Sequence, residues 1–394
     1  MRRSLPLFRR RGSVLLIVLV TLVFASAALL LFIDKAGTDL LVDIRDADAK
    51  RLRLEAYSAL ETTLAVLEDF RDAGDGLHSP TEGWGDPLGF AGYEPAEGRT
   101  VEVTMEDESA KLSLPSVKPE MLIALFKYWQ VTQSDAERIT DALLGWMQKD
   151  YTPTSIGAPT AQDYENAALP FAAPGRSLRS FEELRAIEGV RQAFFDEATG
   201  LPNDLYRHFT ETFSLYRFDK PNLNGNRLEP LFAQELIDDT QQRSVTEYLT
   251  GTGSYQTQGA GFFKNGRSVA AVAGGQLDKL DYGYTVKALR ITVTVRQGVS
   301  SFRLSVVVAP ANGATVIPPS NVTELLPDSS GDTSTDTTNS TATAATAGTY
   351  TSDSSTSSTA VPTTADLKYP FTFLEIHEND KTVPPPASSE DPTA

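Results

Sequence analysis

The residues of this chain whose types and spacing suggest chemistry lie at its N-terminus, and that chemistry is cleavage of the chain itself. Small residues that a peptidase can accept occur at Gly12-Ser13, directly before an apolar run, and at Ala25-Ser26-Ala27, inside it. Cleavage at the first place would remove a basic segment and keep the apolar run, whereas cleavage at the second would remove most of the run. The basic segment contains five arginines: Arg2, Arg3, Arg9, Arg10 and Arg11.

Residues suited to catalysis on another molecule are sparse. Nucleophilic catalysis needs a base beside the nucleophile, yet the three histidines, His78, His208 and His377, stand in no recognisable triad motif such as Gly-x-Ser-x-Gly. The chain has no cysteine, so it has neither thiol chemistry nor disulfides. No cluster in the sequence has the ligand spacing of a transition-metal site. A membrane-anchored hydrolase is therefore the least favoured functional hypothesis.

The apolar run from Val14 to Ile33 predicts a membrane-spanning helix. About 20 residues at about 1.5 Å each match the hydrocarbon core of a bilayer. The arginines before the run favour a cytoplasmic N-terminus, so everything after Asp34 should be exported. Three kinds of processing remain open: a secretory signal cleaved after Ala27, an uncleaved signal anchor, and cleavage between Gly12 and Ser13 on the cytoplasmic face. The first is disfavoured because the chain stays strongly apolar from Ala28 to Ile33.

The third kind of processing resembles that of a type IV prepilin leader. The resemblance implies that prepilin peptidase cleaves between Gly12 and Ser13, and that the new N-terminus is methylated. The assembly helix would then begin with Val14, Leu15, Leu16, Ile17 and Val18. Pilin-like subunits usually carry a glutamate as the fifth mature residue, where this chain has Ile17. In lacking this glutamate the chain resembles the K-type minor pseudopilin of the type II secretion system (general secretion pathway protein K), which is thought to cap the pseudopilus tip.

Several short motifs resemble K-type sequences and occur in the same order. They are Asp141 with Leu143–Asp150, Gly157-Ala158, Tyr164, Pro170-Phe171, Phe181–Arg185 and Asn222-Leu223-Asn224. The chain departs from the family pattern at Gly145 and Gln148, where aspartate is favoured, and at Pro159, where glutamate is favoured. The resemblance covers about residues 10–310 and, weakly, 369–377.

The same resemblance implies a calcium site, because some K-type proteins hold calcium in their helical insert. Calcium takes six to eight oxygen ligands, several of them from carboxylates. The corresponding loop here offers Asp150, Asp163 and Glu165 together with backbone carbonyls. The alternative is a solvated acidic loop. No other cofactor is expected.

The elements that position these residues follow from the periodicity of apolar side chains. Asp34–Asp72 should continue the membrane helix as an amphipathic helix. Residues 119–242 have a mostly helical pattern, with a strand near Phe213. Alternating segments predict two hairpins and a terminal edge strand: 100–105 with 111–114, 284–295 with 302–309, and 369–377.

These elements predict an α+β fold in which a long N-terminal helix packs on an antiparallel sheet, as in a pilin. A large α-helical domain of helix-hairpin-helix or SAM-like character is inserted into it. The expected segments are a prepilin leader (1–12), the transmembrane part of the helix (13–33), the first pilin-like part with helix and hairpin (34–118), the inserted domain (119–242), the second, β pilin-like part (243–326), a disordered Ser/Thr-rich linker (327–366), and a terminal edge strand with tail (367–394).

Charge and family resemblance together lead to a functional hypothesis. The net charge of −17 repels nucleic-acid phosphates and keeps an exported domain soluble, so no nucleic acid partner is expected. The resemblance implies a non-enzymatic tip subunit that initiates pseudopilus assembly and supports export across the outer membrane. It further implies a single-pass inner-membrane protein with its C-terminal bulk in the periplasm. The implied partners are the I- and J-type minor pseudopilins, the major pseudopilin, prepilin peptidase and inner-membrane lipid. The alternative is a membrane-anchored periplasmic interaction module unrelated to secretion.

Overall fold

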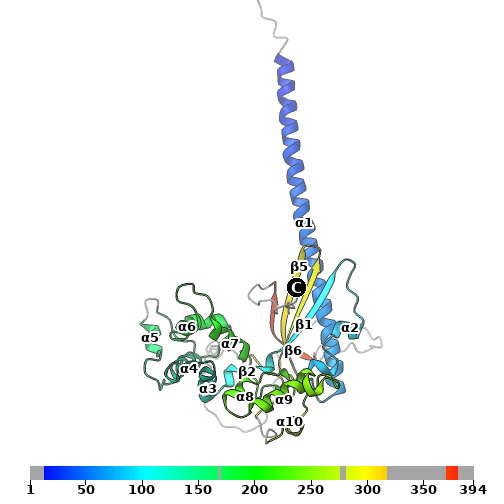
Figure 1. The fold of residues 1–394 in the computed structure, drawn as a ribbon. Helices are drawn as coiled ribbons and strands as arrows, with labels where there is room; N and C mark the ends of the chain where they lie inside the picture. Colours follow the sequence, from blue (N-terminus) through cyan, green and yellow to red (C-terminus); the bar gives the residue numbers. More distant parts are fainter. Residues whose placement is uncertain (1–12, 167–169, 276–280, 317–369, 380–394) are drawn as a thin grey trace, which may run out of the picture.

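The structure is a computed structural model that describes residues 13–166, 170–275, 281–316 and 370–379. The expected leader, 1–12, and the Ser/Thr-rich segment, 327–366, lie outside the described residues. Helix α1 (Ser13–Ala73) runs without interruption for 61 residues, about 90 Å, which confirms that the apolar segment continues as one helix. Its first half stands free of the rest of the chain and its second half packs on a sheet (Figure 1).

The sheet has four antiparallel strands in the order β1-β4-β5-β6. They are β1 (Thr100–Asp107), β4 (Leu289–Gln297), β5 (Ser300–Pro310) and β6 (Phe371–Glu378). The predicted hairpin of β4 and β5 is confirmed, as is the terminal edge strand, which pairs with β5 and shifts register between Val307 and Val308. Strand β4 begins at Leu289 and not at Tyr284, because Val286 donates its N–H to Leu77 outside the sheet.

The predicted hairpin of 100–105 with 111–114 was wrong. Strand β1 pairs instead with β4, with Thr100 opposite Arg296. The 3₁₀ turn η2 (Glu108–Ala110) leads the chain out of the sheet, and the short β2 (Leu112–Ser113) pairs in parallel with β3 (Phe213–Ser214). Both strands of the expected hairpin therefore find partners almost 200 and 100 residues away, which local alternation in sequence could not reveal.

The first hydrophobic core lies between α1 and one face of the sheet. On β4 the odd-numbered residues face the helix, and on β5 the even-numbered ones do, as expected for side chains that alternate across a strand. The helix contributes small and aliphatic side chains at spacings of three and four. The buried members of this core include Leu52, Ala56, Ala59, Leu60, Leu64, Leu67, Ile291, Val293, Val295, Leu304, Val306 and Val308.

The inserted helices have a separate hydrophobic core, to one side of the end of the sheet farthest from the free half of α1 (Figure 1). Rings of Phe126, Phe194 and Phe209 meet at its centre. The predicted helix at 181–187 is the 3₁₀ segment η4 (Phe181–Ala186). The α-helices are α3 (Pro119–Tyr128), α4 (Gln133–Met147), α5 (Ala161–Glu165), α6 (Val190–Phe194) and α7 (Asp204–Thr212).

A third core is formed by residues that precede β4 in the chain, Leu223 to Tyr282. From residue 243 onward β structure was expected here. That expectation was wrong over 243–275, which contains most of α9 (Asp239–Thr250) and all of α10 (Gly266–Ala273). With α8 (Glu229–Ala233) these helices bury Leu231, Val245, Phe263 and Val269. Shorter pieces complete the fold: α2 (Pro87–Ala91) and the 3₁₀ turns η1 (Pro80–Glu82), η3 (Leu114–Ser116), η5 (Leu223–Gly225) and η6 (Gly253–Tyr255).

Candidate functional site

The free half of α1 is the first candidate site. Among the described residues α1 is the one helix long and apolar enough to cross a membrane. The side chains of Leu15, Leu16, Ile17 and Val18 are 56–78% exposed, and the helix first buries a side chain in the protein core at Leu52. Ser13 is the first described residue, and Gly12 lies outside the described range. The helix therefore presents an uncovered apolar surface that suits lipid or other helices.

The second half of α1 is held to both edges of the sheet by polar contacts. Glu55 accepts hydrogen bonds from Tyr93 (2.7 Å) and Arg99 (2.8 Å) on the side of β1. On the side of β6, Glu378 accepts from Arg53 (2.9 Å) and Tyr57 (2.7 Å). The orientation of the helix relative to the sheet is therefore set on two sides, so the free half projects in a defined direction.

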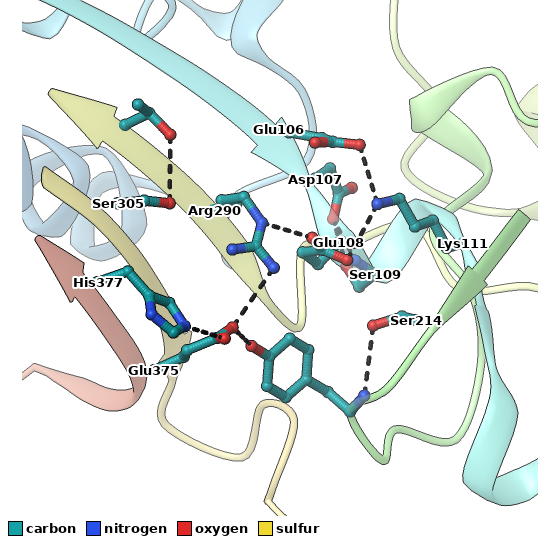
Figure 2. A network of polar contacts seen from close by, with 12 residues as sticks. Glu106, Asp107, Glu108, Ser109, Lys111, Ser214, Arg290, Ser305, Glu375 and His377 are labelled. Carbon is teal, nitrogen blue, oxygen red and sulfur yellow. Dashed lines mark hydrogen bonds and ion pairs between the residues drawn. The ribbon is translucent and has the colours of Figure 1, made fainter. Parts of the chain in front are cut away.

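The second candidate site is a buried polar junction where the end of the sheet meets the insert (Figure 2). Glu108, in the turn after β1, is 4% exposed. It accepts a hydrogen bond from Arg290 of β4 at 2.7 Å and forms an ion pair with Lys111 at 3.2 Å. Lys111 also contacts Glu106 at 3.0 Å. Burial works to raise the pKa of Glu108, but the two cations outweigh it and hold this pKa below its usual value.

Strand β6 joins the same junction through Glu375, which lies on the sheet face opposite α1. Glu375 contacts Arg290 at 3.5 Å and is also hydrogen-bonded to Tyr216 and to the ring of His377. Tyr216 follows β3, the strand that belongs to the insert. One side chain of β6 thus contacts the sheet and the insert at once.

Asp107 connects the junction to the third core. Its carboxylate accepts from the Ser109 backbone N–H (2.9 Å) and hydroxyl (2.5 Å), and from the amide of Asn222 (2.7 Å). Asn222 also donates to the backbone carbonyl of His78 at 3.0 Å. Because burial outweighs these hydrogen bonds, the pKa of Asp107 is raised to about 6. Three segments distant in sequence therefore meet around Asn222 and the Asp107 carboxylate.

The motif Asn222-Leu223-Asn224 forms the turn that holds this arrangement. Asn224 donates to the carbonyls of Phe263 and Tyr284, each at 2.9 Å, and accepts from the Phe263 N–H at 2.7 Å. The next residue must be glycine, since a Cβ on Gly225 would lie 2.0 Å from the Cβ of Ala110. The motif was singled out by resemblance, and its role in joining the junction to the third core was not predicted.

The three residues predicted as calcium ligands are not brought together. Asp150 and Glu165 are exposed, and the Asp163 carboxylate caps α5 by accepting from the Thr160 N–H and hydroxyl, both at 2.7 Å. Within the described ranges no group of three or more His, Cys, Asp or Glu side chains could hold a metal ion. The residues present do not fit calcium.

The three histidines occupy structural positions. His78 is buried against Glu82, with its Nδ1 2.8 Å from a carboxylate oxygen. His208 stacks on Trp129 with ring centroids 5.7 Å apart, and His377 contacts Glu375 in the junction. The contacts described for each ring are thus to an acid or an aromatic group.

Comparison with known proteins gives these features a context. Residues 105–199, from the end of β1 through α6, match the family model for type II secretion system (T2SS), protein K. Within residues 105–199 the chain is thus similar to the K protein of this secretion system. The matched segment contains Glu106, Asp107 and Glu108 of the junction as well as helices α3 to α6 of the insert.

A solved structure is also similar to this chain. It is the crystal structure of the GspK-GspI-GspJ complex from the type 2 secretion system of enterotoxigenic Escherichia coli, with 15% sequence identity and a TM-score of 0.46. The match covers 70% of this chain and 97% of that chain. No curated protein matches the chain.

Proposed function

We propose that this chain is a K-type minor pseudopilin, the tip subunit of the type II secretion pseudopilus, where it initiates assembly and so supports export across the outer membrane. The observation that carries the proposal is the combination of an uncovered apolar helix at one end of the molecule and a bulky insert at the other (Figure 1). A subunit inside a helical filament has neighbours on both sides along the axis. An insert at the distal end would occupy the position of the next subunit, so the chain suits only the end of the filament.

The N-terminal segment supports the same position. The stretch from Ser13 to Ile33 carries no ionisable side chain, and Ile17 stands where other pilin-like subunits have a glutamate. A carboxylate in the membrane is costly unless a neighbouring group neutralises it. A subunit with no neighbour ahead of it does best without one, and Ile17 meets that requirement.

The processing, location and partners belong to this proposal. Prepilin peptidase would cleave between Gly12 and Ser13, and residues 13–33 would anchor the mature chain in inner-membrane lipid as a single pass, with its bulk in the periplasm. The partners would be the I- and J-type minor pseudopilins and the major pseudopilin. The division of the chain at 118 and 326 is proposed as the domain arrangement, whereas the expected boundary at 242 falls inside α9 and the third core. We further propose that the insert has helix-hairpin-helix character around Gly189, which has φ of 81° between η4 and α6.

Mass spectrometry of the N-terminus tests the processing. The protein purified from membranes should begin at Ser13, with a methylated amino group, and Gly12→Leu should leave the leader attached. A Gly37→Leu variant is the matched control, because a Cβ at Gly37 meets nothing within 4 Å. A chain that begins at Ala28, or that keeps Met1 whether or not Gly12 is changed, would contradict a prepilin route.

Secretion tests the role itself. Deletion of the gene should stop release of secreted proteins into the medium, and the wild-type gene should restore it. Ile17→Glu should restore it poorly because it places an unpaired carboxylate in the membrane, whereas Ile17→Leu should restore it fully. Normal secretion in the deletion strain would refute the proposed function and leave the alternative of an anchored interaction module.

A further inference from the structure

The loop after α4 is organised around one buried carboxylate that belongs to none of the sites above. Asp141 lies on α4 and is 4% exposed. Its Oδ1 accepts a hydrogen bond from the hydroxyl of Tyr151. Its Oδ2 accepts from the backbone N–H of Thr154 (2.7 Å), the hydroxyl of Thr154 (3.3 Å) and the backbone N–H of Ser155 (2.6 Å). All four contacts reach residues 10 to 14 positions further along the chain.

From these contacts we infer that Asp141 itself fixes the loop at 151–155, and that the insert of this protein folds without a metal ion. A carboxylate offers about four lone-pair positions, and this loop directs four donors at it, one to Oδ1 and three to Oδ2. Amide and hydroxyl hydrogens therefore stand where a cation would have to approach Oδ2. The inference does not depend on where the subunit stands in a filament.

The neighbouring acidic residues give a metal ion no alternative. Asp150 is exposed, Glu165 is exposed on α5, and the Asp163 carboxylate is used as a cap. Gly145, one turn after Asp141, faces the loop, with Tyr151 and the Pro159 carbonyl each 3.8 Å from the position of a Cβ. A calcium ion needs several carboxylates that point at one position. In this loop, by contrast, several hydrogen-bond donors point at one carboxylate.

The electrostatics of Asp141 agree with this assignment. Burial works to raise its pKa, but the hydrogen bonds from Tyr151, Ser155 and Thr154 outweigh burial and lower it. The carboxylate therefore stays ionised at neutral pH, as charge-assisted hydrogen bonds require. The loop that it holds places Ile156 at its tip with a side chain 99% exposed.

The experiment measures thermal unfolding of the full chain in detergent with EGTA or with about 10 mM CaCl₂, which would saturate even a weak calcium site. Calcium should change the Tm of the wild type by less than about 1 °C. Asp141→Ala should lower it by about 5 °C in either buffer, because two amides and two hydroxyls lose their acceptor. Asp141→Asn should keep most of the stability, since its oxygen can accept from both amides and its NH₂ can donate to Tyr151.

Trypsin gives a second, local measurement. The exposed Lys149 lies two residues before the loop, so cleavage after Lys149 should be faster in Asp141→Ala than in the wild type, and equally so with EGTA and with CaCl₂. Asp150→Ala is the matched control: it removes an exposed carboxylate beside the loop and should leave both the Tm and the cleavage rate unchanged.

Three results would overturn the inference. A rise of more than about 3 °C in the wild-type Tm on adding CaCl₂ would show a calcium site. Equal stability of Asp141→Ala and Asp150→Ala would show that Asp141 does not hold the loop. Asp141→Asn as unstable as Asp141→Ala would show that the negative charge, and not the hydrogen-bond pattern, is required.

Discussion

The change of Arg290 to Met tests whether the buried junction holds the sheet and the insert together. Arg290 is 18% exposed at its side chain and its partner Glu108 is 5% exposed. The variant leaves Glu108 buried with Lys111 as its only cation, and removes one of the contacts of Glu375. Removing one partner of a buried ion pair typically costs about 3–5 kcal/mol of unfolding free energy. We expect a loss in this range at pH 7.

The same strand supplies a control. Arg296 also lies on the sheet face opposite α1 and pairs with Glu102 at 3.4 Å, but these side chains are 59% and 58% exposed. An exposed pair contributes about 0.2–1 kcal/mol, so Arg296→Met should cost several-fold less than Arg290→Met. The assay is urea unfolding of the purified full chain followed by tryptophan fluorescence. Equal losses for the two variants would refute the reasoning.

A double mutant and a lower pH isolate the cause. Adding Glu108→Gln to Arg290→Met removes the unpaired charge, and should recover about 2 kcal/mol of the loss. Without the guanidinium, burial raises the pKa of Glu108, so the side chain can take up a proton as the pH falls. The loss caused by Arg290→Met should therefore be smaller at pH 5 than at pH 7. Additive losses, or a loss that does not depend on pH, would argue against a buried charge as the cause.

Three further predictions concern the surroundings of the junction. The pKa of Asp107 is raised to about 6 from 3.8, so its contribution to stability is complete below pH 3.8 and is lost as the pH rises through 6. In melts at different pH, the difference in Tm between wild type and Asp107→Asn should therefore change over this window and stay constant above pH 7. Asn224→Ala removes three hydrogen bonds, two of them to Phe263, and should cost about 3 kcal/mol of unfolding free energy in urea; a loss below about 0.5 kcal/mol would exclude a structural role for this turn. Gly225→Ala should fold poorly and recover when combined with Ala110→Gly, as judged by yield and Tm, because the two Cβ atoms would otherwise lie 2.0 Å apart.

The parts of the fold that the sequence predicted well are those whose signal is local. Helix α1 follows from a run of apolar residues and a continuous helical stripe without proline, and both patterns are contained in the helix. The hairpin of β4 and β5 follows from two alternating segments separated by Gln297-Gly298. Hydrophobic periodicity and turn residues record which side of an element is buried, and neighbouring segments pair most often.

The junction and the third core escaped prediction because their signals are not local. Glu106, Asp107 and Glu108 form an acidic run that in most chains would be solvated, and only the fold brings Lys111, Arg290 and Asn222 to them. Helix α9 is rich in polar residues and α10 is only eight residues long, in a segment with many glycines and polar residues, so this part of the chain resembles a loop until Phe263 and Val269 are seen to be buried. The calcium hypothesis rested on a count of carboxylates, which does not show where they point.

Strand β4 joins α1 to the insert because its two faces have different partners. Leu289, Ile291 and Val293 pack against α1, whereas Arg290, between the first two, reaches the junction on the opposite face. A slip of one residue in the pairing of β4 would exchange these faces, placing the Arg290 guanidinium against the apolar helix. The cost of burying that charge without a partner excludes the slip. The junction therefore also fixes the register of the sheet, and with it the direction in which the insert lies relative to α1.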